Sequence, residues 1–371
     1  MRMRRLIAMS FAVAATASSA QPPAPDPAPP APASVEVDVS VDPRIELLLI
    51  VQHLTGDYEK RTRLITDFDF AYKREIEEHF RPFAMHTVVM TYRAMALKGF
   101  SFDAGPQAMM RLTADESLSP RSPMPEDLLK RVGGAEQFET FRSQIADFAQ
   151  ASGFWKFFAD HKPLYDELCR NVNETARPGE LVAALNDYTG MRVSNAHLVL
   201  FPMGHPGGFA AHVIPEVDGV KQAEEVFAVV GPGGAKDDKP VFGGESAPWF
   251  ESLIIHEFAH TIVNPLAEDN AERVAGSAAK LEPIRQQMSR QAYQNWRTVV
   301  NEHIVRAIEC RLALRRHGIS AGMAKMNQEV KRSFTYVPGL VQALTRYEQD
   351  RARWPTLRDF YPELLALFEA E

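Results

Sequence analysis

The chain has 371 residues, of which 45% are hydrophobic and 24% are charged. These proportions are typical of soluble globular proteins, and they exclude a wholly disordered chain and a polytopic membrane protein. The formal net charge is −7 at pH 7. An acidic chain lacks the positive charge that sequence-independent binding of nucleic acid requires, so we expect no nucleic-acid partner.

The N-terminus has the layout of a secretory signal. Arg2, Arg4 and Arg5 form a basic start, residues 6–17 are mostly apolar, and residues 18–20 are small. Because the apolar run is too short to span a bilayer, this order predicts a signal peptide over residues 1–20, the alternative being an N-terminal membrane anchor. Cleavage would change the net charge from −7 to −10. We therefore expect an exported protein, periplasmic or secreted, with no integral membrane segment after signal removal.

The next part of the chain begins with a linker. Residues 21–34 contain seven prolines among fourteen positions, which predicts an extended Pro/Ala-rich spacer. Strict alternation over residues 35–41 predicts a half-buried strand. Apolar residues then recur every three or four positions, which predicts helices over 44–54, 68–80, 83–97 and 137–158. Residues 35–190 are therefore expected to be mainly helical.

The period changes in the middle of the chain. Residues 196–203, 208–215 and 225–230 are predicted strands, and residues 248–263 and 290–317 are predicted helices. Asn264-Pro265 is a predicted stop signal for the first of these helices. A small mixed or antiparallel sheet followed by long helices predicts an α+β fold for residues 191–371, and this part can form one unit with the helices before it.

The chain contains two cysteines, Cys169 and Cys310. In an exported protein they can form a disulfide, but Cys310 also suits the apolar face of a helix as a buried thiol. Neither cysteine has the spacing of a cysteine zinc site. The two readings stay open.

The strongest chemical signal is the sequence His256-Glu257-Phe258-Ala259-His260. Residues four apart on a helix lie on one face, so both imidazoles can reach one metal ion. Zn²⁺ suits two imidazole nitrogens in a tetrahedral shell. Glu257 lies beside the open position, where it can act as general base on a water whose pKa falls to roughly 7 on zinc. This arrangement predicts metal-assisted hydrolysis.

A catalytic zinc usually has three protein ligands, so one more is required. The predicted helix that contains Trp296 offers Glu302 and His303. On a helical wheel His303 falls on the apolar stripe with Trp296, whereas Glu302 lies on another face. Periodicity therefore favours His303 or is neutral between the two residues.

Together with the helix motif, Asn301-Glu302 resembles the gluzincin branch of zinc metallopeptidases, in which an Asn-Glu pair on a later helix supplies a glutamate ligand. The resemblance implies a zincin-like fold with an active-site helix, and it implies Glu302 as the third ligand, with His303 as the alternative. Over residues 36–365 the chain also resembles an uncharacterised bacterial family, domain of unknown function 4932. That resemblance runs through Asp42-Pro43-Arg44-Ile45-Glu46-Leu47-Leu48, residues 256–265, Ala292-Tyr293 with Trp296, and Glu302 with Arg306-Ala307.

Two further roles depend on the same resemblance. Where some gluzincins have an aspartate four residues after the ligand glutamate, this chain has Arg306. Arg306 would bind a substrate carboxylate, hold Glu302 in place, or form a surface salt bridge. By analogy with gluzincin tyrosines, Tyr336 is the expected donor to the oxyanion, with a core tyrosine as the alternative.

An extended peptide substrate usually pairs with the edge of a sheet. The strand with Gly208, Phe209 and Ala210 is the candidate edge because glycine permits close approach of another backbone. An ordinary hairpin is the alternative. These features predict an exported zinc-dependent hydrolase of peptidase type that acts on peptides or proteins. The alternatives are a non-catalytic zinc-binding envelope scaffold or binding protein, and a zinc amidase that acts on cell-wall peptides.

Overall fold

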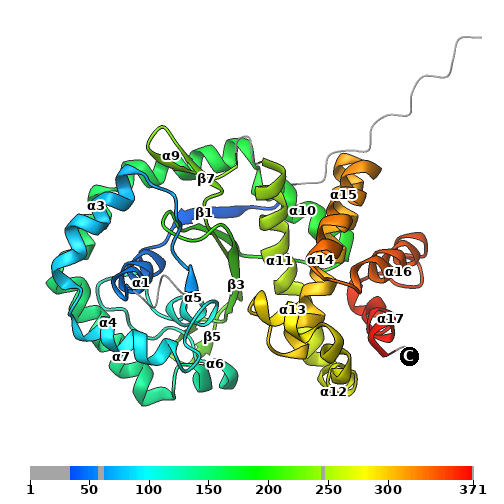
Figure 1. The fold of residues 1–371 in the computed structure, drawn as a ribbon, viewed down its shortest axis with the longest axis horizontal. Helices are drawn as coiled ribbons and strands as arrows, with labels where there is room; N and C mark the ends of the chain where they lie inside the picture. Colours follow the sequence, from blue (N-terminus) through cyan, green and yellow to red (C-terminus); the bar gives the residue numbers. More distant parts are fainter. Residues whose placement is uncertain (1–33, 57–61, 244–246, 370–371) are drawn as a thin grey trace, which may run out of the picture. The chain divides into compact units, whose positions relative to one another are not determined.

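The structure, a computed structural model, describes residues 34–56, 62–243 and 247–369 (Figure 1). The predicted signal peptide and all but the last residue of the predicted linker lie outside these ranges. The described residues all belong to one compact unit. In the described ranges, no helix is long and apolar enough to cross a membrane.

A four-stranded mixed sheet forms the centre of the fold and confirms the predicted α+β class. Its strand order is β1 (Val37–Val41), β2 (Ala196–Leu200), β6 (Glu225–Val230) and β3 (Gly208–Val213). The first three strands are parallel to one another, and β3 is antiparallel to β6. Because β1 comes from the N-terminal part of the chain, the sheet joins residues 35–190 to residues 191–371. Two small ribbons accompany it, β4 (Glu216–Val217) with β5 (Val220–Lys221), and β7 (Gly234–Lys236) with β8 (Lys239–Val241).

Strand composition follows from where each strand lies in the sheet. The inner strand β6 is buried from Val226 to Val230, and β2 is buried from Leu198 to Leu200. Continuous apolar runs of this kind occur where helices cover both faces of a sheet. The edge strand β3 is only partly buried at Gly208, Phe209 and Ala210.

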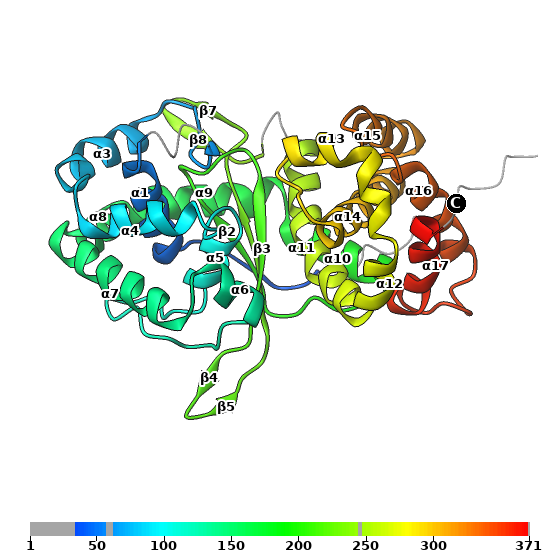
Figure 2. The same ribbon diagram turned by 60° about the horizontal axis from the view of Figure 1, so that its bottom comes forward.

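Helices lie on both sides of the strands (Figure 2). The N-terminal helices are α1 (Pro43–Leu54), α3 (Ala71–Phe80), η1 (Arg81–Phe83), α4 (Thr87–Ala96), α5 (Ala104–Met109), α6 (Glu126–Arg131), α7 (Ala135–Ala151), α8 (Phe154–Asp160), α9 (Lys162–Thr175) and α10 (Pro178–Thr189). The C-terminal helices are α11 (Ala247–Asp269), α12 (Ala271–Gly276), η3 (Ala278–Ile284), α13 (Arg285–Arg290), α14 (Trp296–His317), α15 (Ile319–Lys331), α16 (Val337–Gln349) and α17 (Leu357–Glu369). Figure 2 shows α1 to α8 on one side of the sheet and α11 to α17 on the other.

Two predicted helices have different boundaries because the backbone turns within them. The helix predicted over 137–158 is two helices, α7 and α8, separated at Gly153, whose φ of 67° is left-handed. The helix predicted from residue 290 starts only at Trp296. Ala292 adopts a left-handed φ of 69°, and the side chain of Asn295 caps the new helix by accepting a hydrogen bond from Thr298 N.

The predicted stop at Asn264-Pro265 is wrong, because α11 continues to Asp269. A proline inside a helix costs about 3 kcal/mol. Ile262, Val263 and Leu266, on both sides of the proline, are at most 4% exposed. Burying each such side chain contributes roughly 1.5–3 kcal/mol, so tertiary packing outweighs the local cost.

The two cysteines do not form a disulfide. Both are free, Cys169 half-buried and Cys310 buried. Cys310 lies on α14 as part of the apolar core, as the buried-thiol reading expected.

Candidate metal centre

Helix α11 carries the sequence motif through the interior of the protein. Residues 254–263 are all buried, because the sheet lies against one side of the helix and α14 against another. His256 and His260 are each 9% exposed, and Glu257 is 4% exposed. Polar side chains buried to this extent require partners, since an unpaired buried polar group is costly.

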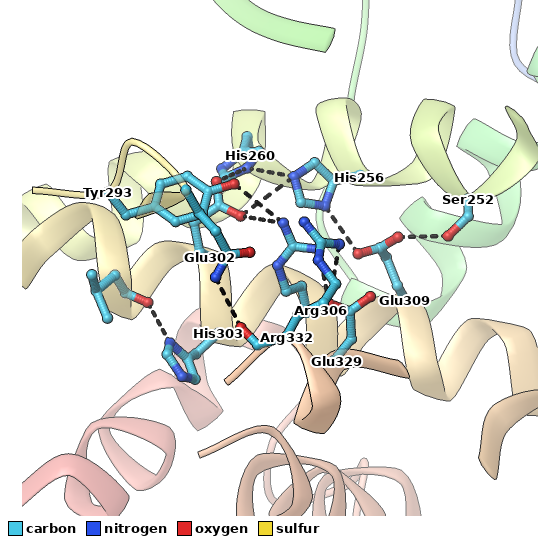
Figure 3. A network of polar contacts seen from close by, with 12 residues as sticks. Ser252, His256, His260, Tyr293, Glu302, His303, Arg306, Glu309, Glu329 and Arg332 are labelled. Atoms are coloured by element: carbon cyan, nitrogen blue, oxygen red, sulfur yellow. Dashed lines mark hydrogen bonds and ion pairs between the residues drawn. The ribbon is translucent and has the colours of Figure 1, made fainter. Parts of the chain in front are cut away.

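The two imidazoles and Glu302 of α14 converge on one point (Figure 3). The Nε2 atoms of His256 and His260 are 3.1 Å apart. Glu302 places Oε2 3.6 Å from His256 Nε2 and Oε1 3.3 Å from His260 Nε2. The three ligand atoms lie within 4.8 Å of one another, a spacing that a single metal ion can bridge.

The other nitrogen of each imidazole is hydrogen-bonded to an oxygen acceptor. His256 Nδ1 lies 2.9 Å from Oε2 of Glu309, and His260 Nδ1 lies 3.2 Å from Oδ1 of Asn264. The same Asn264 oxygen accepts a hydrogen bond from Asn301 Nδ2 at 2.8 Å. Oxygen acceptors at both Nδ1 atoms assign the proton to Nδ1 and leave a lone pair on each Nε2.

With both protons on Nδ1, the candidate metal centre contains only electron-rich groups and is stabilised by a positive charge. Two Nε2 lone pairs and a carboxylate would repel one another at these distances unless a cation or a proton lies between them. In the absence of a metal, burial alone would lower the pKa of His260, but Glu302 and Glu257 raise it to about 9. The donor set of two imidazole nitrogens and one carboxylate oxygen therefore fits Zn²⁺.

Glu302 is held from behind by Arg306. The guanidinium donates to Glu302 Oε2 at 2.9 Å and to Glu329 Oε2 at 3.0 Å, and it lies 4.1 Å above the ring of Phe334. Burial alone would raise the pKa of Glu302, but Arg306 and the histidines hold it well below its usual range. Glu302 is therefore ionised, and Arg306 sets its orientation.

The carboxylate of Glu257 lies against the edge strand β3. A methyl group on Gly208 would be 2.7 Å from Glu257 Oε1 and 2.8 Å from its Cδ. Only glycine can therefore occupy this position of β3 without moving the carboxylate. Burial raises the pKa of Glu257 above its ordinary value, and the neighbouring His256 and His260 offset this only in part.

Residues 37–367 match the family described as Domain of unknown function (DUF4932). The chain belongs to this family. No curated protein and no solved structure matches the chain. The family assignment confirms the resemblance over most of the chain, while the gluzincin resemblance of the DUF4932 domain stays a prediction.

The alternative ligand His303 does not belong to the candidate metal centre of this DUF4932 domain. Its ring points away from the imidazole pair, and its Nδ1 lies 2.7 Å from the carbonyl oxygen of Val299 (Figure 3). The ring packs against Phe334, Tyr336 and Phe368, and it is fully buried. Burial lowers its pKa to about 4, so His303 is a neutral core residue.

Tyr336, expected as oxyanion donor, belongs to the same aromatic cluster as His303. Its hydroxyl lies 3.4 Å from the carbonyl oxygen of Lys280, and its ring packs on Trp296 and Phe368. The structure therefore does not bring Tyr336 to the imidazole pair. This location matches the core-tyrosine alternative.

Tyr293 is nearer to the centre than Tyr336. Arg306 Nη2, which binds Glu302, also donates to the hydroxyl of Tyr293 at 3.3 Å. Because the hydroxyl accepts this bond, its own proton can be donated elsewhere. The tyrosine follows Ala292, which lies just beyond α13 and has a left-handed φ of 69° that non-glycine residues rarely adopt. Ala292-Tyr293 is part of the DUF4932 resemblance, but nothing in its local pattern indicates a role.

Of the three roles expected for Arg306, two do not fit its surroundings. It is 5% exposed, which is incompatible with a surface salt bridge. Its guanidinium is bonded to Glu302 and Glu329, so its position corresponds to the role of holding Glu302.

The partner of His256, Glu309, was not predicted as a site residue. Glu302, Arg306 and Glu309 are spaced at i, i+4 and i+7 on one face of α14, and that spacing is the signal that could have identified Glu309.

Proposed function

We propose that this DUF4932 protein is an exported zinc-dependent hydrolase that cleaves peptides or proteins. The observation that carries the proposal is the convergence of two imidazole Nε2 lone pairs and the ionised Glu302 beside the buried carboxylate of Glu257. In the described part of the chain, no fourth histidine, cysteine, aspartate or glutamate joins this group. A three-ligand set leaves an open position, which favours catalysis over a closed structural site.

The residues around the centre have distinct parts in the proposed reaction. When bound, zinc lowers the pKa of a coordinated water to roughly 7 and polarises a carbonyl group. Glu257 takes the proton from the attacking water and passes it to the leaving amine. Tyr293 donates a hydrogen bond from its hydroxyl to the carbonyl oxygen that becomes negative, while Arg306 holds both Tyr293 and Glu302.

The test compares the mature protein with a Glu257→Gln variant. Zinc content is measured by elemental analysis, and turnover is measured on a peptide library. We expect Glu257→Gln to keep its zinc and to lose about 10²–10⁴-fold in rate, because the general base is absent. Turnover at the wild-type rate by this variant would rule out the proposed mechanism.

Glu251→Gln is the matched control. Glu251 lies on the same helix and pairs with Arg316 and His317 instead of the imidazoles. The Glu251→Gln variant should retain both its zinc and its hydrolytic activity. Bound zinc in the wild-type protein without hydrolysis of any peptide would favour the scaffold alternative, and hydrolysis confined to cell-wall peptides would favour the amidase.

A further inference from the structure

The backbone of β3 has one side bonded to β6 and one free side. Gly231 N donates to Gly207 O at 2.9 Å, so this opposing pair is hydrogen-bonded. The next pair is Gly208 with Val230, whose carbonyl instead accepts from Phe201 N on the β2 side. Hydrogen-bonded and non-hydrogen-bonded pairs alternate along an antiparallel ladder. The even-numbered residues of β3 therefore direct their backbone groups to the free edge.

The free edge consists of Gly208, Ala210 and His212, and its last position is already occupied. The carbonyl oxygen of His212 accepts a hydrogen bond from Arg111 Nη2 at 2.8 Å. Just beyond the strand, the carbonyl oxygen of Ile214 accepts one from Ser122 Oγ at 2.8 Å. The backbone groups of Gly208 and Ala210 have no hydrogen-bond partner at this edge in the described part of the chain.

Arg111 and residues 119–123, which we call the edge clamp, are firmly attached to the sheet. Arg111 also donates from Nε to Pro123 O at 3.1 Å and from Nη1 to Gln107 O at 2.7 Å, and it is 6% exposed. Arg121 of the same segment forms a bidentate ion pair with Glu225, the first residue of β6. A buried guanidinium with three carbonyl partners does not leave its position without a large loss of hydrogen bonding.

We infer that the substrate pairs with only two residues of the β3 edge, Gly208 and Ala210, and that the edge clamp ends the binding groove at His212. The inference rests on the proposed function, because Glu257 against Gly208 marks where the bond is cleaved. From Gly208 to Ala210 the edge is about 7 Å long at a rise of about 3.4 Å per residue. On the side of the cleaved bond that lies along β3 toward His212, the groove therefore holds two or three residues of the substrate. The enzyme therefore removes short peptides from a chain end.

Graded ligands test the length of the groove without requiring turnover. We would measure binding of two series of peptide hydroxamates to the zinc-loaded chain by calorimetry, with the hydroxamate anchored at the metal. One series extends from the hydroxamate toward the peptide N-terminus, the other toward the C-terminus. Each paired residue contributes backbone hydrogen bonds that are worth up to about tenfold in affinity. We expect one series to gain affinity for two or three residues and nothing after that.

Variants of the clamp sharpen the test. Arg111→Met frees the His212 carbonyl and keeps an apolar side chain, so the affinity should rise again at the fourth and fifth residues, by up to about tenfold. Arg131→Met is the matched control, because Arg131 binds the carbonyls of Gly99 and Ser101 and does not contact β3. It should keep the wild-type profile. Because the wild-type series alone measures the groove, a misfolded Arg111→Met variant does not prevent the test.

Three outcomes would overturn the inference. The first is an affinity that rises steadily through five residues in both series. The second is an affinity that does not rise over the first two residues in either series. The third is efficient cleavage far from both ends of long peptides. The last result would retain the hydrolase and remove only the length limit. Conversely, length-limited binding without hydrolysis of any peptide would remove the proposed activity and support the length limit of the groove.

Discussion

At the scale of single residues, the candidate metal centre depends on partners that fix the imidazole tautomers. Glu309 accepts from His256 Nδ1 and also binds Ser252 Oγ at 2.6 Å and Lys325 Nζ at 2.9 Å. Burial alone would raise the pKa of Glu309, but Lys325 and His256 hold it well below its usual range. An ionised acceptor of this kind increases the basicity of the other imidazole nitrogen, Nε2, which would bind a metal ion.

Glu309→Gln is expected to weaken zinc binding by about tenfold, because the neutral amide keeps an acceptor but loses the charge. Competition with a chelator of known affinity measures the change. Glu251→Gln, on α11 but away from the centre, should bind zinc as the wild type does. An unchanged zinc affinity in Glu309→Gln would show that the carboxylate does not tune His256.

At the scale of elements, α1 carries an acid into the apolar interior. Glu46 is 1% exposed, and its Oε2 accepts a hydrogen bond from the Tyr72 hydroxyl of α3 at 2.5 Å. That hydroxyl also lies 2.7 Å from the hydroxyl of Tyr165 on α9, so three helices meet at one network. Among the residues that the structure describes, Glu46 Oε1 has no hydrogen-bond partner. Burial raises the pKa of Glu46 to about 8, and the hydrogen bond from Tyr72 offsets this only in part.

The sign of the pH dependence follows from this shift. A folded-state pKa of about 8 lies above the ordinary value of 4.5, so the folded state binds the proton more tightly. The free energy of unfolding should therefore fall as pH rises from about 4.5 to about 8, by up to roughly 1.4 kcal/mol per pH unit. Glu46→Gln keeps the shape and removes the ionisation, so its stability relative to wild type should increase across this window.

Urea unfolding of both proteins at pH 5 and pH 8 checks this expectation. Glu78→Gln, an exposed position on α3, serves as the control and should leave the pH dependence unchanged. If the difference between Glu46→Gln and wild type is the same at both pH values, Glu46 does not titrate in this range.

At the scale of the whole molecule, the centre joins layers that come from distant parts of the chain. Helix α11 supplies the histidines, α14 supplies Glu302, and β3 covers Glu257. A bound cation would therefore connect α11 to α14 in the folded state and would have no comparable site in the unfolded chain.

Zinc should accordingly raise the thermal stability of the protein. At a free concentration of about 100 times Kd, a ligand adds about 2.7 kcal/mol to the free energy of unfolding. For a chain of this size we expect Tm to rise by roughly 3–5 °C, and a chelator should reverse the shift. Calorimetric scans with zinc and with chelator measure it. His260→Ala should abolish the difference, and equal Tm values in the wild type would contradict a metal bound at this centre.

Local patterns were sufficient where neighbouring residues along the chain decide the outcome. The strand alternation and apolar runs predicted β1, β2, β3 and β6 close to their observed ranges. The i, i+4 spacing placed His256 and His260 on one face of a helix, because helical geometry is set by the backbone itself. The same motif identified Glu257, the acid that follows His256, as the candidate general base.

Periodicity did not single out Glu302 over His303. The gluzincin resemblance implied Glu302, and the tertiary structure gives the physical reason. Helix α14 is buried from Val299 to Leu312, so its periodicity has no polar side from which to predict direction. The packing of α14 on α11 directs Glu302 to the imidazoles and His303 into an aromatic cluster. The contact of Gly208 with Glu257 and the closure of β3 by Arg111 likewise join residues that are 49 and 101 positions apart. Such long-range contacts depend on how helices and strands pack in space, which no local pattern encodes.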